Sequence, residues 1–297
     1  MKRWTLVVIA LALVLAAGWL VFANRSALRQ TVASVTKPAL PTAQPYAPSA
    51  ITKPASVEVP AGGAALGSPE RAQPEASTSG VNAATGPAAT PTTAPSQTKP
   101  TTTTASTAIP QELNLAVPFI TQAPRGDWGL PYQEACEEAS VIMGAAYFNG
   151  ETSITPDDAD KRILDTVAWE KQTFGFYEDT TAEETARMAR EHFGLQATVK
   201  PVTTIDDIKA ELAQGSVVLL PSAGRLLGNP NFSGAGPLYH MLVVKGYLRD
   251  GRIITNDPGT RHGADYLYDP TVLYNAIHDW NGGDVEHGSK VMIVLNK

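Results

Sequence analysis

One cysteine and five histidines are the residues of this chain best suited to nucleophilic chemistry. The single cysteine, Cys136, cannot form an intramolecular disulfide. A free cysteine is most often a small buried apolar residue, but the sequence around this one predicts a reactive position. It falls in the first turn of a helix expected from Glu134 to Phe148, where unpaired N–H groups and the helix dipole stabilise a thiolate.

The thiol needs a cationic partner, because the two residues after it are acidic. The charges of Glu137 and Glu138 raise the pKa expected for Cys136. A protonated histidine can hold the thiolate. We favour His240, which opens the apolar strand predicted over 240–248 after a loop rich in Gly and Pro. A lone histidine at a strand start is as often a structural residue, so this choice depends on the cysteine.

An acceptor on the neighbouring strand can fix the tautomer of the histidine. Asp250-Gly251 predicts a hairpin turn, so the strand that ends in Asn256-Asp257 should lie beside the strand of His240. We prefer Asp257 to Asn256 as the orienting group because it is charged. Side-chain alternation allows only one of them to face the histidine.

Further residues are expected to bind the oxyanion or the substrate. The backbone N–H of Cys136 is one oxyanion donor, and the side-chain amide of Gln122 is a second, although a solvated loop residue is the simpler interpretation of Gln122. Substrate-binding candidates lie close in sequence to the nucleophile or the histidine, and for the first two packing is an equal alternative: Trp128, Tyr132, Glu137 and Tyr239.

The pattern of helix caps and strands predicts an α+β fold with an antiparallel sheet. Helices with capping residues come first, and they are expected at 134–148, from 155, at 181–194 and at 204–214. Strands follow, and they are expected at 217–221, 240–248, 252–256 and 290–295. No glycine-rich phosphate loop is present.

The first 112 residues differ in composition from the rest. Residues 1–25 contain an apolar run that is long enough to cross a bilayer, which predicts a retained signal anchor; a cleaved signal peptide is the alternative. Residues 26–112 are rich in Ala, Thr, Pro and Ser, with Tyr46 as the only aromatic residue, which predicts a disordered linker. The folded domain is expected over 113–297.

The residues singled out resemble, in order, the motifs of the C39-like peptidase family within the papain-like group. The matching segments are Val117-Pro118-Phe119-Ile120-Thr121-Gln122, Ala135-Cys136-Glu137-Glu138-Ala139-Ser140, Tyr239-His240-Met241-Leu242-Val243-Val244-Lys245-Gly246-Tyr247 and Asn256-Asp257-Pro258-Gly259. The resemblance covers about 113–297. It implies a papain-like fold, with the nucleophile helix packed on the sheet, and hydrolysis of peptide bonds. By position it implies these roles: Gln122 in the oxyanion hole, Cys136 as nucleophile, His240 as base and Asp257 as orienter.

One departure narrows the resemblance. Bacteriocin-processing members carry Gly after the cysteine and a transporter domain, whereas Glu137 follows Cys136 here. The chain is more similar to the stand-alone Cys-Glu-x-x-Ser branch, so cleavage after a double-glycine leader is not expected.

These observations predict a membrane-anchored, extracytoplasmic cysteine peptidase that acts on peptides or on peptidoglycan peptides. A peptidoglycan amidase or endopeptidase and a non-catalytic peptide-binding module are the alternatives. Nucleic acid is not an expected partner, because residues 113–297 carry a net charge of −10. No cofactor is needed. A metal site at His240, Asp257 and His262 is disfavoured because no metal-ligand spacing is present.

Overall fold

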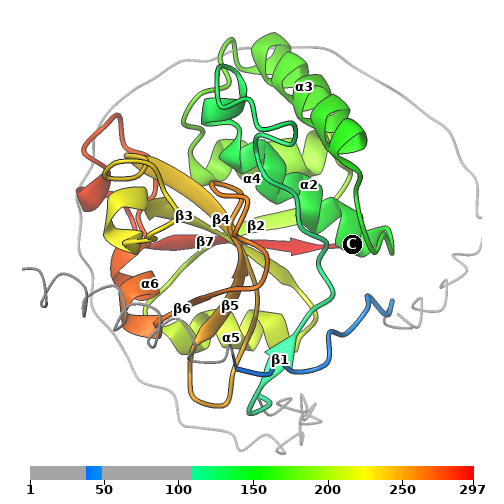
Figure 1. Ribbon diagram of the computed structural model, residues 1–297, viewed down its shortest axis with the longest axis vertical. Coiled ribbons are helices and arrows are strands. Elements are labelled where there is room, and N and C mark those ends of the chain that lie inside the picture. The colour runs from blue at the N-terminus through cyan, green and yellow to red at the C-terminus, as the bar shows by residue number, and fades with distance from the viewer. Residues whose placement is uncertain (1–37, 49–108) are drawn as a thin grey trace, which may run out of the picture. The chain divides into compact units, whose positions relative to one another are not determined.

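The computed structural model describes residues 38–48 and 109–297 (Figure 1). The predicted membrane segment within 1–25 and most of the predicted linker lie outside these residues. Within the described part, no helix is both long enough and apolar enough to span a membrane.

A seven-stranded antiparallel sheet forms the centre of the domain. Its strands follow the order β2-β7-β3-β4-β5-β6, and β1 pairs with the C-terminal end of β4. The strands are β1 (Leu113–Asn114), β2 (Gln196–Pro201), β3 (Val217–Ala223), β4 (Tyr239–Tyr247), β5 (Ile253–Asn256), β6 (Tyr266–Tyr268) and β7 (Val291–Asn296). Every residue of β3, β4 and β5 is buried, so the strands that carry His240 and lead to Asp257 form the rigid middle of the molecule.

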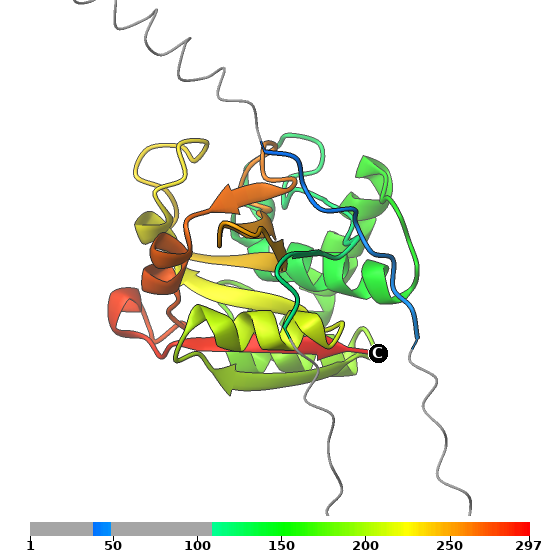
Figure 2. The same ribbon diagram turned by 90° about the horizontal axis from the view of Figure 1, so that it is seen from below.

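Helices cover both sides of this sheet. The α-helices are α2 (Cys136–Phe148), α3 (Pro156–Thr173), α4 (Ala182–Glu191), α5 (Ile205–Ala213) and α6 (Pro270–Ala276). Three short 3-10 helices are η1 (Tyr132–Glu134), η2 (Gly224–Leu227) and η3 (Val285–His287). Figures 1 and 2 show α2, α3 and α4 grouped on one side of the strands and α5 on the other. The mixture of helices and antiparallel sheet confirms the predicted α+β class.

The buried helix α2, which begins at Cys136, packs against the sheet. All of its residues are buried, which small side chains and one glycine make possible. A Cβ atom at Gly144 would lie 2.6 Å from a methyl group of Leu295 in β7. A side chain at this position would therefore require Leu295 to move, since van der Waals contact between carbons needs about 3.5 Å or more.

Local signals in the sequence predict most elements correctly. Thr155 caps α3, and Thr181 forms a capping box with Glu184 at the start of α4, as expected. The hairpin at Asp250-Gly251 joins β4 to β5, as expected. The prediction that all helices precede the sheet is wrong, because β2 lies between α4 and α5 and pairs with β7.

Residues 38–47 pack on the domain, and we call them the N-terminal strap. The backbone of Gln44 exchanges hydrogen bonds with Asn114 and Ala116, and the Tyr46 ring contacts Tyr147 and Phe148 edge to face. The prediction of a disordered linker over 26–112 is therefore wrong for this stretch, since the one aromatic residue of the linker finds an apolar surface at the end of α2.

Candidate active site

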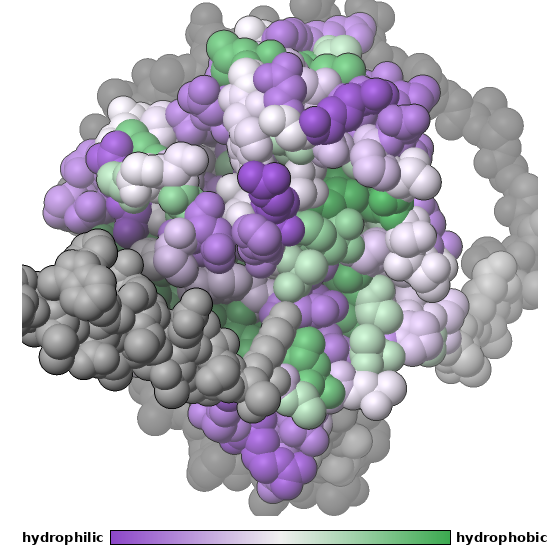
Figure 3. Space-filling model, viewed as in Figure 1, coloured by the Kyte–Doolittle hydropathy of each residue, from purple (hydrophilic) through white to green (hydrophobic). Residues whose placement is uncertain are grey.

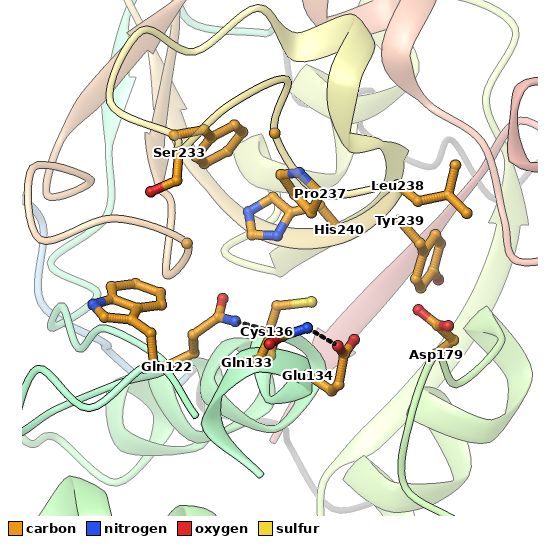
Figure 4. Close-up of a pocket in the computed structure, with 14 residues that line it drawn as sticks. Gln122, Gln133, Glu134, Cys136, Asp179, Ser233, Pro237, Leu238, Tyr239 and His240 are labelled. Carbon is orange, nitrogen blue, oxygen red and sulfur yellow. Dashed lines mark hydrogen bonds between the residues drawn. The ribbon is translucent and has the colours of Figure 1, made fainter. Parts of the chain in front are cut away.

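Cys136 is the first residue of α2, and its sulfur lies against the strand of His240. The amide of Met241 donates a hydrogen bond to Cys136 Sγ at 3.3 Å. Met241 directly follows His240 along β4, so the sulfur contacts the strand at the histidine itself. Figure 4 shows the Cys136 and His240 side chains near each other, and both line one cavity. The packing of α2 on β4 thus brings together two residues that lie 104 positions apart in the sequence.

The thiol donates a hydrogen bond to a buried acidic neighbour. Cys136 Sγ lies 2.9 Å from Glu137 Oε2, and both residues are almost fully buried. Burial, followed by the charge of Glu137, raises the pKa of Cys136 well above its usual value. Burial, followed by the charge of Glu138, raises the pKa of Glu137. Burial therefore disfavours the charged form of each group, and two negative charges side by side are disfavoured further.

Asp257 contacts the histidine and is held by further donors. Its Oδ1 lies 2.8 Å from His240 Nε2 and also accepts from the Gly259 amide, while Oδ2 accepts from Tyr268 and Asn229. Burial alone would raise the pKa of Asp257, but the charge and hydrogen bond of His240, together with the other donors, lower it. The side chain is thus a fixed carboxylate that orients the ring.

Asn256 does not contact the histidine. Its amide donates to the carbonyl oxygens of Val117 and Pro118, and its Oδ1 accepts from the amide of Asp265. Alternation along β5 turns its side chain away from Asp257, as the sequence predicts. Of the two alternatives left open above, the geometry selects Asp257.

The histidine ring is enclosed from two sides. Phe232 packs edge to face on His240 with ring centroids 5.3 Å apart. A Cβ atom at Gly259 would lie 2.8 Å from His240 Cε1, so only glycine lets the loop after Asp257 close over the ring. Within the described residues, no hydrogen bond joins the ring to the sulfur of Cys136, and Nε2 is occupied by Asp257. Nδ1 is the ring nitrogen left for chemistry.

Gln122 lines the cavity, but its amide nitrogen is already bonded. Nε2 donates to the carbonyl oxygens of Tyr132 and Gln133, at 3.0 and 2.9 Å. The oxygen Oε1 is buried and has no hydrogen-bond partner in the described part of the chain. Figure 4 shows this oxygen on the cavity side of the amide. The expected donation from Gln122 to an oxyanion would need the amide to rotate.

The cavity has a volume of about 530 Å³, and two of the four substrate-binding candidates line it. Trp128 and Tyr239 line it, as expected. Tyr132 does not, since its hydroxyl donates to Asp160 on the other side of the loop. Glu137 lies behind the thiol and is not part of the wall.

Two acidic residues of the wall were not predicted. Glu134 ends η1, two residues before Cys136, and Asp179 comes from the loop between α3 and α4. Burial, followed by the charges of Glu134 and Glu178, raises the pKa of Asp179 to about 6. A pattern of acids around the cysteine could have revealed Glu134, but no local signal marks Asp179.

Two more carboxyls are buried behind the nucleophile. Glu138 of α2 and Glu170 of α3 are both fully buried, and no hydroxyl, amide or cation among the described residues bonds their oxygens. Burial, followed by the charge of Glu170, raises the pKa of Glu138. Burial raises the pKa of Glu170 to about 8. One shared proton would turn the pair into a hydrogen bond between α2 and α3.

Comparisons with known proteins identify the family of the chain. A crystal structure provisionally described as a C39-like peptidase from Bacillus anthracis matches with a TM-score of 0.43 and 16% identity, covering 63% of this chain and 98% of that one. No curated protein matches the chain. The model of the Peptidase C39 like family matches residues 114–282, which include Cys136, His240 and Asp257. The chain therefore belongs to the Peptidase C39 like family.

Proposed function

We propose that this protein is a papain-like cysteine peptidase in which Cys136 is the nucleophile, His240 is the general base and Asp257 orients the histidine. One observation carries the proposal: the sulfur accepts a hydrogen bond from the amide next to His240, while the ring of His240 is fixed by a buried carboxylate. A nucleophile, a base within reach and a third group that orients the base form the arrangement that activates thiols.

The first step is the transfer of the thiol proton to His240 Nδ1. The proton leaves its hydrogen bond with Glu137, so the Cys136 side chain must turn toward the ring. The Met241 amide keeps a donor on the sulfur and favours the thiolate, since a hydrogen bond to the charged form lowers its pKa. Asp257 stabilises the imidazolium that results.

The thiolate then attacks the carbonyl carbon of a peptide bond. The oxyanion forms beside the start of α2, where the backbone N–H of Cys136 is available as a donor, because Ala135 provides no side-chain cap. His240 returns its proton to the leaving amine, and the acyl group stays on the sulfur as a thioester. Water, deprotonated by His240, hydrolyses the thioester and restores the thiol.

The substrate we propose is a peptide on the outer side of the membrane, with residues 4–23 as a single-pass anchor. The apolar run supports the anchor, and the single cysteine is compatible with an exported domain that needs no disulfide. Peptidoglycan peptides are the narrower alternative, and secretion after signal cleavage is the alternative location. Protease digestion of intact cells separates an exposed domain from an internal one.

A non-catalytic peptide-binding module is the second candidate. Two features favour it: the thiol is bonded to a buried acid, and the Gln122 amide is turned to backbone carbonyls. Both features would have to change before acyl transfer. A binding module has no need for that change.

A thiol-reactive probe separates the two candidates. The chain has one cysteine, so labelling reports on Cys136 alone. The peptidase predicts labelling of Cys136 near neutral pH that slows in His240→Ala. It also predicts cleavage of peptides from a proteome or wall digest that Cys136→Ala abolishes. Labelling that His240→Ala leaves unchanged, with no cleaved peptide, would leave the binding module.

A further inference from the structure

Two acidic side chains lie in the cavity wall beside Cys136. Glu134 and Asp179 present carboxylates to the cavity, and Figure 4 shows both on the side of Cys136 away from Gln122. The lining contains no Lys or Arg, and His240 is its single basic side chain. The wall beside the nucleophile is thus negative and lacks a built-in counter-charge.

Neither carboxylate is neutralised by a cation of the protein. Across the described residues, Asp179 makes no hydrogen bond or ion pair, and Glu134 accepts only from the amide of Gln133. Both are partly buried. Like charges that remain close in a partly desolvated site repel one another, which is consistent with the raised pKa of Asp179.

Gln122 supplies an independent observation on the opposite side of the sulfur. Its side chain is only 5% exposed, and its Oε1 faces the cavity without a donor. A buried oxygen without a partner is costly, by about 1–3 kcal/mol for a typical polar group. A ligand with N–H groups would satisfy it. Acceptors at both ends of the cavity therefore point to one kind of ligand, which is rich in donors and positively charged.

We propose that this cavity selects substrates that carry a cationic nitrogen, an amino or guanidino group, close to the bond that is cleaved, with Glu134 and Asp179 as the residues that determine the specificity. The proposal deepens the function proposed above and rests on it for the cleavage step. An amino or guanidino group between the two carboxylates gains charge-assisted hydrogen bonds in a site that is shielded from bulk water. A neutral or acidic group would leave both carboxylates unpaired.

Charged thiol reagents test the electrostatics without any need for turnover. A methanethiosulfonate reagent forms a mixed disulfide with Cys136 and releases methanesulfinate. The rate constant for the cationic 2-aminoethyl reagent is divided by the rate constant for the anionic 2-sulfonatoethyl reagent. This rate ratio is then divided by the same ratio measured with 2-mercaptoethanol. The proposal predicts a cation preference of at least about tenfold that weakens with added salt.

Two variants assign the preference to its residues. Glu134→Gln and Asp179→Asn should each reduce the ratio by about threefold or more. Asparagine tolerates the left-handed backbone at Asp179, where φ is +50°. Asp165→Asn is the matched control, because it removes one negative charge from an exposed position on α3 and should leave the ratio unchanged. A ratio equal to that of 2-mercaptoethanol, or unaffected by the two variants, overturns the proposal.

Peptide cleavage separates this proposal from the function on which it rests. Two peptides that differ only in acetylation of one lysine beside the scissile bond are compared with wild-type protein. Preference for the free lysine, reduced in Asp179→Asn, supports both. Equal cleavage together with a flat reagent ratio removes the specificity and leaves the peptidase. No cleavage of any peptide, with a clear reagent preference, removes the peptidase and leaves a cation-binding cavity.

Discussion

The buried carboxyls Glu138 and Glu170 make the stability of this domain depend on pH in an unusual direction. Most acidic residues have a lowered pKa in the folded state and stabilise the fold above their unfolded pKa. Here burial raises the pKa of Glu170 from 4.5 to about 8. Between these two values the folded chain binds more protons than the unfolded chain. The free energy of unfolding is therefore highest at low pH and falls as pH rises through about 8.

The size of the effect follows from this change in pKa. A carboxyl whose pKa is raised from 4.5 to about 8 on folding destabilises the fold, relative to low pH, by at most about 5 kcal/mol once pH exceeds both values. Between about pH 5 and about pH 8 the loss has an upper limit of about 3 kcal/mol. Glu170→Gln removes the titrating group and keeps an amide that can donate to Glu138. We expect the variant to match wild type near pH 5 and to be more stable by up to about 3 kcal/mol near pH 8.

Urea unfolding of the whole protein at the two pH values measures this difference. Tryptophan fluorescence reports the transition, since Trp169 precedes Glu170 in α3. Asp165→Asn on the same helix is the control and should change the free energy of unfolding by under about 1 kcal/mol at either pH, because its ion pair with Lys161 is exposed. A Glu170→Gln variant that is less stable than wild type by the same amount at both values would refute the shared proton.

Three further changes test the site and its surroundings. Tyr268→Phe removes one donor from the buried Asp257, so we expect kcat/KM on a cleaved peptide to fall about tenfold and the free energy of unfolding to fall by about 1–3 kcal/mol. An unchanged rate would show that the remaining donors suffice. Glu137→Gln removes the carboxyl that accepts the thiol hydrogen bond and whose charge raises the pKa of Cys136. Alkylation of Cys136 near neutral pH should therefore accelerate several-fold. Slower alkylation would mean that Glu137 assists ionisation. Tyr46→Ala should lower the free energy of unfolding by about 1–2 kcal/mol and make the strap sensitive to proteases. A strap that stays protease-resistant would show that its backbone hydrogen bonds alone hold it on the domain.

Residues whose role is set by their nearest neighbours were predictable from the sequence. Thr181 and Glu184 form their capping box wherever the helix lies, and Asp250-Gly251 turns the chain by itself. The choice of Asp257 could also be approached, because a hairpin fixes which strands are adjacent and alternation fixes the faces.

Residues whose role depends on distant packing could not be predicted. Asp179 reaches the cavity because α3 and α4 pack beside α2, and nothing around it in the sequence records that. Tyr132 was expected in the cavity, but its hydroxyl finds Asp160, 28 residues away. The strap was missed for a related reason: its composition is that of a linker, and its order depends on contacts with Tyr147 and Phe148.

The acidic wall and the neutral thiol can be understood together. Burial and the charges of Glu137 and Glu138 disfavour the thiolate, and the resting site holds the proton on the sulfur. A cationic group bound between Glu134 and Asp179 would offset that negative charge at the moment when substrate is present. Ionisation of Cys136 would then be easier in the complex than in the free protein, and the lone thiol would be less exposed to oxidation between turnovers. The same carboxylates would thus select the substrate and delay activation until it arrives.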